Sequence, residues 1–123
     1  MITLKTLPQA TAQEVFDQIT AHLLKQGKAA RTSTGSCRYR TETQGEVLKC
    51  AAGCLIADDE CDRLFEYVSW NALVNCGKVP KQHARLIWQL QLVHDMELPA
   101  DWPHYFKGIA REPRLQYNSP QPT

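Results

Sequence analysis

The spacing of apolar residues changes along the chain, and this change limits the possible fold more than any other feature. A period near 3.6 residues is typical of a helix packed on a core, and a period of two is typical of a half-buried strand. Helical spacing recurs in residues 11–26 and in several stretches after residue 60, whereas residues 37–50 alternate. This order predicts an α+β fold in which one β-hairpin packs on a bundle of about four helices.

The first helix has clear signals at both ends. Thr11 and Glu14 have the spacing of a capping box, in which each side chain accepts a hydrogen bond from the other residue's main-chain N–H. Gly27 suits the left-handed conformation that ends many helices. We therefore expect a helix from about Thr11 to Gln26.

Three further stretches have helical spacing. Residues 61–76 predict one helix or two short helices. Pro80 suits the first position of the next helix, which we expect to reach Asp95. The apolar stripe of that helix consists of Leu86, Ile87, Leu90, Val93 and His94. Asp101 can cap a last short helix that Pro113 ends.

The length of the chain allows one hydrophobic core. The chain has 123 residues, and a second core would need roughly fifty more to bury enough apolar surface. We expect a single domain over residues 1–115. Residues 116–123 contain two prolines and predict a flexible C-terminal tail.

The alternating segment predicts a hairpin with two different faces. A four-residue loop at residues 42–45 would place Cys37 opposite Cys50 and turn Tyr39 and Leu48 toward the core. A two-residue loop formed by the last two residues of that turn is the alternative, and it shifts the pairing. The basic residues of the hairpin then lie on the opposite, outer face, and we predict that they contact a partner. These residues are Arg38, Arg40 and Lys49.

The overall charge excludes a general attraction to polyanions. The chain has 14 basic and 13 acidic residues and a formal net charge of +1, so a local patch must account for any binding to nucleic acid. Charges interrupt the apolar stretches well before the roughly twenty residues that cross a bilayer, and the first residues lack the apolar run of a signal peptide. We expect no membrane contact and a cytoplasmic location.

The five cysteines predict free thiols, because an odd number without a secretory signal argues against a disulfide framework. Small buried hydrophobic residues are the simplest interpretation. A zinc site is the alternative, although no pair has the C-x-x-C spacing that favours one. Its ligands would be Cys37, Cys50, Cys54 and Cys61, or three of these with His94.

A cysteine-dependent hydrolase or transferase is a further alternative. Cys50, or Cys54, would be the nucleophile, and His94 or His83 would activate it. Asp95 follows His94 directly, but neighbours on a helix point about 100° apart. We therefore do not expect Asp95 to orient His94, and we expect His94 to be a half-buried residue near a helix C-terminus.

The three tryptophans have two interpretations that the sequence leaves open. Trp70, Trp88 and Trp102 would each anchor the core if buried, because an indole buries a large area and needs only one hydrogen-bond partner. A tryptophan left on the surface would instead be a hot spot for a protein contact.

The middle of the chain resembles a known group of proteins. Residues 37–40 read Cys-Arg-Tyr-Arg, Gly45 follows, and residues 50–59 read Cys-Ala-Ala-Gly-Cys-Leu-Ile-Ala-Asp-Asp. This combination is similar to a core found in small uncharacterised proteins of phages and prophages, and Trp102 fits the later part of that pattern. The chain departs from it at Cys61, where an aromatic residue is expected. The resemblance implies a phage context and no specific activity.

These observations favour a small, non-enzymatic protein that covers part of a macromolecular partner. The phage resemblance implies a host protein as the partner, and inhibition of a host or defence enzyme as the effect. The cysteine enzyme and a zinc-binding or nucleic-acid-binding module are the alternatives. The sequence makes no prediction of the oligomeric state.

Overall fold

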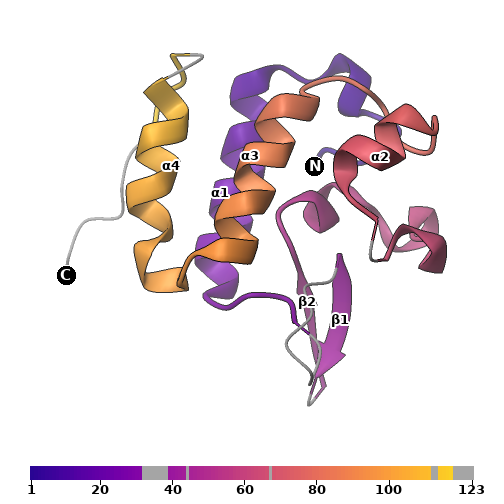
Figure 1. Ribbon diagram of the computed structural model, residues 1–123, viewed down its shortest axis with the longest axis horizontal. Helices are drawn as coiled ribbons and strands as arrows, with labels where there is room; N and C mark the ends of the chain where they lie inside the picture. The colour runs from indigo at the N-terminus through magenta and orange to yellow at the C-terminus, as the bar shows by residue number, and fades with distance from the viewer. Residues whose placement is uncertain (32–38, 44, 67, 112–113, 118–123) are drawn as a thin grey trace.

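The computed structural model describes residues 1–31, 39–43, 45–66, 68–111 and 114–117. Within these ranges the chain forms four α-helices and one antiparallel β-hairpin, which confirms the predicted α+β fold (Figure 1). The helices and strands are α1 (Ala12–Gln26), β1 (Arg40–Thr43), β2 (Glu46–Lys49), α2 (Trp70–Asn75), α3 (Ala84–Met96) and α4 (Trp102–Arg111). Short 3-10 segments are η1 (Leu7–Gln9), η2 (Ala52–Leu55), η3 (Asp58–Glu60), η4 (Arg63–Phe65) and η5 (Pro99–Asp101).

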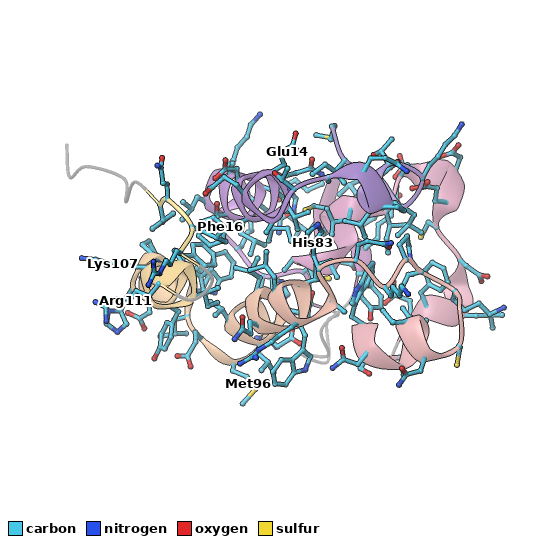
Figure 2. The ribbon with its side chains drawn as sticks, turned by 90° about the horizontal axis from the view of Figure 1, so that it is seen from above. Glu14, Phe16, His83, Met96, Lys107 and Arg111 are labelled. Carbon is cyan, nitrogen blue, oxygen red and sulfur yellow. The ribbon has the colours of Figure 1, made fainter. Side chains whose placement is uncertain are left out.

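Helix α1 has the predicted ends. The Thr11 side chain accepts from the Glu14 N–H, and the Glu14 carboxylate accepts from the Thr11 N–H at 2.8 Å. Gly27 closes the helix in the left-handed conformation, with φ of 71°. Figure 2 shows Phe16 pointing from α1 into the interior, where it is fully buried.

Helix α3 is the central element of the fold. It contacts α1, α2, α4 and η2, and it lies beside α1 and α4 in Figure 1. Its predicted stripe is buried throughout, which confirms the helical period as the signal for this part of the core. The buried residues are Leu86, Ile87, Leu90, Val93 and His94.

The start of α3 differs from the prediction. The helix begins at Ala84, four residues after Pro80, and His83 precedes it with a positive φ of 62°. The imidazole Nε2 of His83 lies 2.7 Å from the main-chain oxygen of Ala10. This long-range contact holds His83 in a conformation that few non-glycine residues adopt, so a local proline signal could not locate the helix start.

The other helices follow the predictions more closely. Residues 61–76 contain two short helical pieces, η4 and α2, as the second of the two options proposed. Ser69 caps α2 by accepting from the Ala72 N–H at 3.1 Å. Asp101 ends η5, and α4 follows it directly with Trp102 and Phe106 buried. Pro113 lies outside the described residues.

The hairpin uses the shorter of the two loops. Arg40 pairs with Lys49 and Thr43 pairs with Glu46, so the four-residue loop is wrong. Cys50 donates its main-chain N–H to Tyr39 O at 3.3 Å, which continues this register and leaves Cys37, outside the described residues, not opposite Cys50. The predicted faces survive, because a shift by two residues preserves the alternation. Tyr39, Leu48 and Cys50 are buried.

Side chains of α1 fasten the hairpin to the helices. The Gln26 amide donates to Lys49 O at 2.9 Å and accepts from the Lys49 N–H at 2.9 Å. The His22 ring lies 2.9 Å from the same carbonyl oxygen. An isolated hairpin is marginal in water, so these contacts and its buried face hold it in place.

The chain beyond α4 returns to the helices. The Tyr117 ring packs edge-on against Phe16 and Phe106, with centroid distances of 5.6 and 6.0 Å. Gln116 donates its main-chain N–H to the Gln13 side chain at 2.8 Å. Gln116 and Tyr117 are therefore attached to the core and do not belong to the tail predicted at residues 116–123, of which residues 118–123 lie outside the described part of the chain.

Candidate functional site

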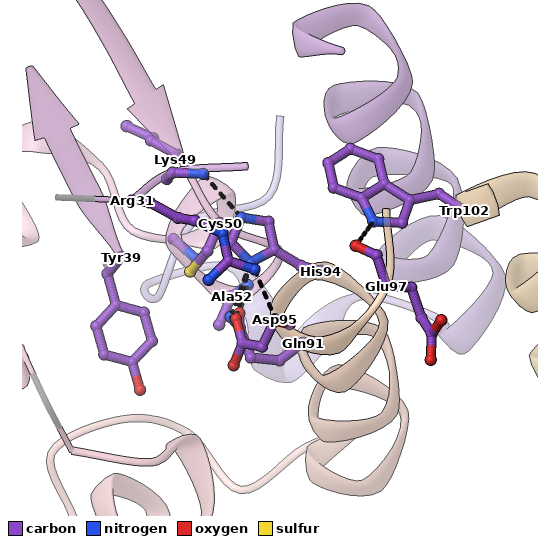
Figure 3. A network of polar contacts seen from close by, with 12 residues as sticks. Arg31, Tyr39, Lys49, Cys50, Ala52, Gln91, His94, Asp95, Glu97 and Trp102 are labelled. Carbon is purple, nitrogen blue, oxygen red and sulfur yellow. Dashed lines mark hydrogen bonds and ion pairs between the residues drawn. The ribbon is translucent and has the colours of Figure 1, made fainter. Parts of the chain in front are cut away.

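A pocket lies where the hairpin, α2 and α3 meet. Its volume is about 250 Å³. Aromatic and aliphatic side chains line it together with two carboxylates from different segments. The lining residues are Tyr39, Cys50, Glu66, Val68, Ser69, Trp70, Trp88, Gln91, Leu92 and Asp95. Figure 3 shows part of this region, with Tyr39 on one side and Gln91 and Asp95 on the other.

Two contacts hold the hairpin side of the pocket in place. The Tyr39 hydroxyl donates to the main-chain oxygen of Val68. The Glu66 carboxylate accepts from the main-chain N–H groups of Tyr39 at 3.2 Å and Arg40 at 3.4 Å. The loop before α2 is thus joined to the first strand, and the pocket is formed before any ligand binds.

His94 lies behind this pocket and is fully buried, not half-buried as expected. Its Nδ1–H donates to Asp95 Oδ1 at 2.8 Å, and its Nε2 accepts from the Ala30 N–H at 2.9 Å. A nitrogen that accepts carries no proton, so the ring is neutral with its hydrogen on Nδ1. The ring also stacks on Trp102, at a centroid distance of 5.8 Å.

The expectation that Asp95 would not orient His94 is wrong. The 100° rule describes where side chains leave the helix, but both of these side chains lean toward a third group. The Gln91 amide donates to the same Asp95 Oδ1 at 2.7 Å and also accepts from the Ala52 N–H at 2.9 Å. This hydrogen-bonded Gln91 holds the carboxylate close to the imidazole (Figure 3).

The proposed nucleophile is poorly suited to catalysis. Burial raises the pKa of the Cys50 thiol well above its usual value, and the charges of Asp95 and Glu66 raise it further. Both nitrogens of His94 already have partners, so neither is available to take a proton from Cys50. The geometry counts against the Cys50 and His94 pair as a catalytic site, because the nucleophile in such sites is a thiolate.

The zinc alternative also lacks a suitable cluster. Within the described ranges, no three His, Cys, Asp or Glu residues are placed to hold a metal ion. Every proposed ligand set contains three described members besides Cys37, which lies outside these ranges. The four described cysteines, Cys50, Cys54, Cys61 and Cys76, are free thiols.

The predicted basic contacts are bound to an acid of the same chain. Arg40 Nε and Lys49 Nζ each lie 3.4 Å from Asp58 Oδ1, and the two cations hold the pKa of Asp58 below its usual value. The side chains of Arg40 and Lys49 are only 30% and 22% exposed. The predicted outer basic face is therefore partly neutralised, while Arg38 lies outside the described residues.

The sequence interpretation did not single out the exposed apolar side of α3. Trp88, Leu92 and Met96 are spaced four residues apart and are 40%, 39% and 74% exposed. The signal was present, because Trp88 and Leu92 fall outside the buried stripe of the same helix. Trp70 and Trp102 are buried core anchors, so the open question about the tryptophans has a different answer for Trp88.

Comparison with models of protein families, with curated proteins and with solved structures found no match to this chain. Among the described residues, no helix is both long and apolar enough to cross a membrane.

Proposed function

We propose that this protein binds another protein through a surface on α3 formed by Trp88, Leu92 and Met96, which we call the α3 surface. The observation that carries the proposal is the exposure of these three large apolar side chains on one face of the central helix. Single exposed apolar residues are common and need no explanation. Three of them in one row, beside a pocket that two of them line, are typical of an interface.

The composition of this surface fits a protein partner. Tryptophan and methionine are enriched at protein interfaces, and tryptophan is among the residues that contribute most to binding free energy. The three side chains lie along one helix and leave a continuous apolar row, with Met96 directed away from the body of the molecule in Figure 2. Burial of this row against a partner would provide the main favourable term.

The identity of the partner rests on the resemblance of residues 37–59 to proteins of phages and prophages. It supports a host protein as the partner, inhibition of a host or defence enzyme as the effect, and the host cytoplasm as the location. Arg38, Arg40 and Lys49 remain predicted additional contacts. To reach a partner, Arg40 and Lys49 would have to exchange Asp58 for an acid of that partner, which makes them weaker candidates than Trp88.

Affinity capture from host cytosol with matched variants tests this proposal. Trp88→Ala and Leu92→Ser should each lose a protein that the unmodified chain retains. Leu64→Ser is the control, because Leu64 is 73% exposed but lies in η4, away from α3. The retained protein is then purified, and its affinity for each variant is measured by calorimetry. Equal binding by all four chains would mean that the α3 surface is not the interface.

A further inference from the structure

The pocket beside the α3 surface has a character of its own, which the apolar row does not explain. Its lining residues include two carboxylates, those of Glu66 and Asp95, and no lysine, arginine or histidine. The acids come from distant parts of the chain, one from the loop before α2 and one from the end of α3. The fold thus brings two negative groups to the wall of one small cavity.

Hydrogen bonds fix both carboxylates in position. Glu66 accepts from two main-chain N–H groups, and Asp95 accepts from the Gln91 amide and from the neutral His94 ring. All four donors are uncharged, so these bonds orient the carboxylates without neutralising them. Arg31 reaches the same region and donates to the main-chain oxygen of Asp95 at 2.7 Å, so a guanidinium group is already bound at the edge of this network.

The neighbours of the pocket respond to a negative field. Burial raises the pKa of both Cys50 and Tyr39, and the charges of Glu66 and Asp95 act on both in the same direction. The effect of both acids on two groups from opposite ends of the hairpin places them near one another. A cation in the pocket would be attracted by both.

Aromatic rings supply the second feature that cations prefer. Trp70, Trp88 and Tyr39 all line the pocket, and an arginine or lysine head group is attracted to the face of such rings. Arginine suits this combination best, because its planar guanidinium both stacks on aromatic rings and pairs with carboxylates. The buried indole N–H of Trp70 has no acceptor among the described residues, which favours a ligand that also carries carbonyl oxygens, as a peptide does.

The size of the pocket limits the ligand to one side chain. Sites for drug-sized ligands and cofactors measure roughly 300–1,000 Å³, whereas this pocket measures about 250 Å³. Trp88 and Leu92 belong both to the pocket and to the exposed row on α3. A peptide segment lying along α3 could therefore direct one of its side chains into the pocket.

We propose that the pocket receives an arginine side chain of the protein partner, held between the tryptophans and the carboxylates of Glu66 and Asp95. This inference rests on the proposed function, because the arginine belongs to the protein that covers the α3 surface. It adds the chemistry of the partner, which should present an arginine next to apolar residues.

The probe is Nα-acetyl-arginine amide, titrated into isotopically labelled protein while the indole N–H signals of the three tryptophans are followed by NMR. The signals of Trp70 and Trp88 should shift, and that of Trp102, buried on the far side of His94, should not. Nα-acetyl-citrulline amide is the matched control, because it has nearly the same shape and no charge. We expect it to bind at least about fivefold more weakly, the ratio that corresponds to ~1 kcal/mol for a cation at an aromatic site.

The variant Glu66→Gln should weaken binding of the arginine probe, and Glu46→Gln, which removes an exposed acid outside the pocket, should not. Equal affinity for arginine and citrulline, or no shift of the Trp88 signal at any soluble concentration, overturns the inference. This result is separate from the capture experiment. A partner that is lost on Trp88→Ala but retained by Glu66→Gln would leave the α3 surface intact and remove the arginine.

Discussion

Gly53 lies so close to Tyr39 that no other residue fits at its position. A Cβ atom at Gly53 would lie 1.9 Å from the main-chain oxygen of Tyr39, whose carbonyl cannot move without displacing the first strand. The approach brings η2 directly onto the hairpin and sets the position of Cys50 and Tyr39, two residues of the pocket.

Gly53→Ala should therefore destabilise the protein through overpacking. We expect a loss at or above the upper end of the roughly 1–3 kcal/mol that overpacked cores show, measured as the free energy of unfolding in urea. Gly108→Ala is the control, because nothing lies within 4 Å of a Cβ there and alanine is favoured within a helix by roughly 0.5–1 kcal/mol. Similar effects of the two substitutions would contradict the close approach at Gly53.

His94→Phe tests the buried histidine while keeping a ring of similar shape. The substitution leaves the Ala30 N–H and the Asp95 carboxylate without their shared partner. Each buried polar group that loses its partner costs roughly 1–3 kcal/mol, so we expect a loss of at least about 2 kcal/mol in urea unfolding. The exposed His104 provides the matched substitution His104→Phe, for which we expect almost no change. A stable His94→Phe variant would mean that the network contributes little.

The cysteines should differ in their reactivity toward iodoacetamide. Burial raises the pKa of Cys50, and it raises that of Cys54 to about 12, so almost no thiolate forms at either residue at neutral pH. Cys61 and Cys76 are exposed. Mass spectrometry of native protein should find Cys61 and Cys76 modified first, and Cys50 and Cys54 modified only after unfolding. Rapid modification of native Cys50 would restore the cysteine enzyme as a candidate.

Glu60 should make stability depend on pH, because its carboxylate holds the N-terminal segment. It accepts from the main-chain N–H groups of Leu4, Lys5 and Ala57, each at 3.0 Å. Partial burial acts to raise its pKa, but these hydrogen bonds outweigh burial and keep the pKa below its usual value. A lowered folded-state pKa means that the stabilisation is fully present above the unfolded value of about 4.3 and is lost as the pH falls through the folded value.

Glu60→Gln should lower stability at pH 7 by about 1 kcal/mol, less than a fully buried charged hydrogen bond contributes because the carboxylate is partly exposed. The difference from the unmodified protein should shrink as the pH falls below about 4.3. Urea unfolding at several pH values measures both effects, with Asp59→Asn, a neighbouring exposed acid, as the control. A difference that stays constant down to acid pH would mean that the charge of Glu60 is not the cause.

The sequence by itself determined the features that depend on nearby residues. The capping box of Thr11 and Glu14 and the closing Gly27 set the ends of α1, because their hydrogen bonds span three or four residues. The small residues before Cys54 indicated close packing, which Gly53 provides. The period of α3 predicted its buried stripe, since helical geometry alone decides which side chains share a face.

Only the tertiary structure decided the features that depend on distant residues. The start of α3 depends on His83 meeting Ala10, and the position of Asp95 depends on Gln91, which in turn binds the backbone of η2. Arg40 and Lys49 meet Asp58 only because the chain folds back after β2. Trp88 has the same composition and local spacing as a core residue, and it is exposed because no other element among the described residues covers that side of α3. Local hydrogen bonds and periodicity are present in the sequence, whereas the partner that each side chain meets exists only after the chain has packed.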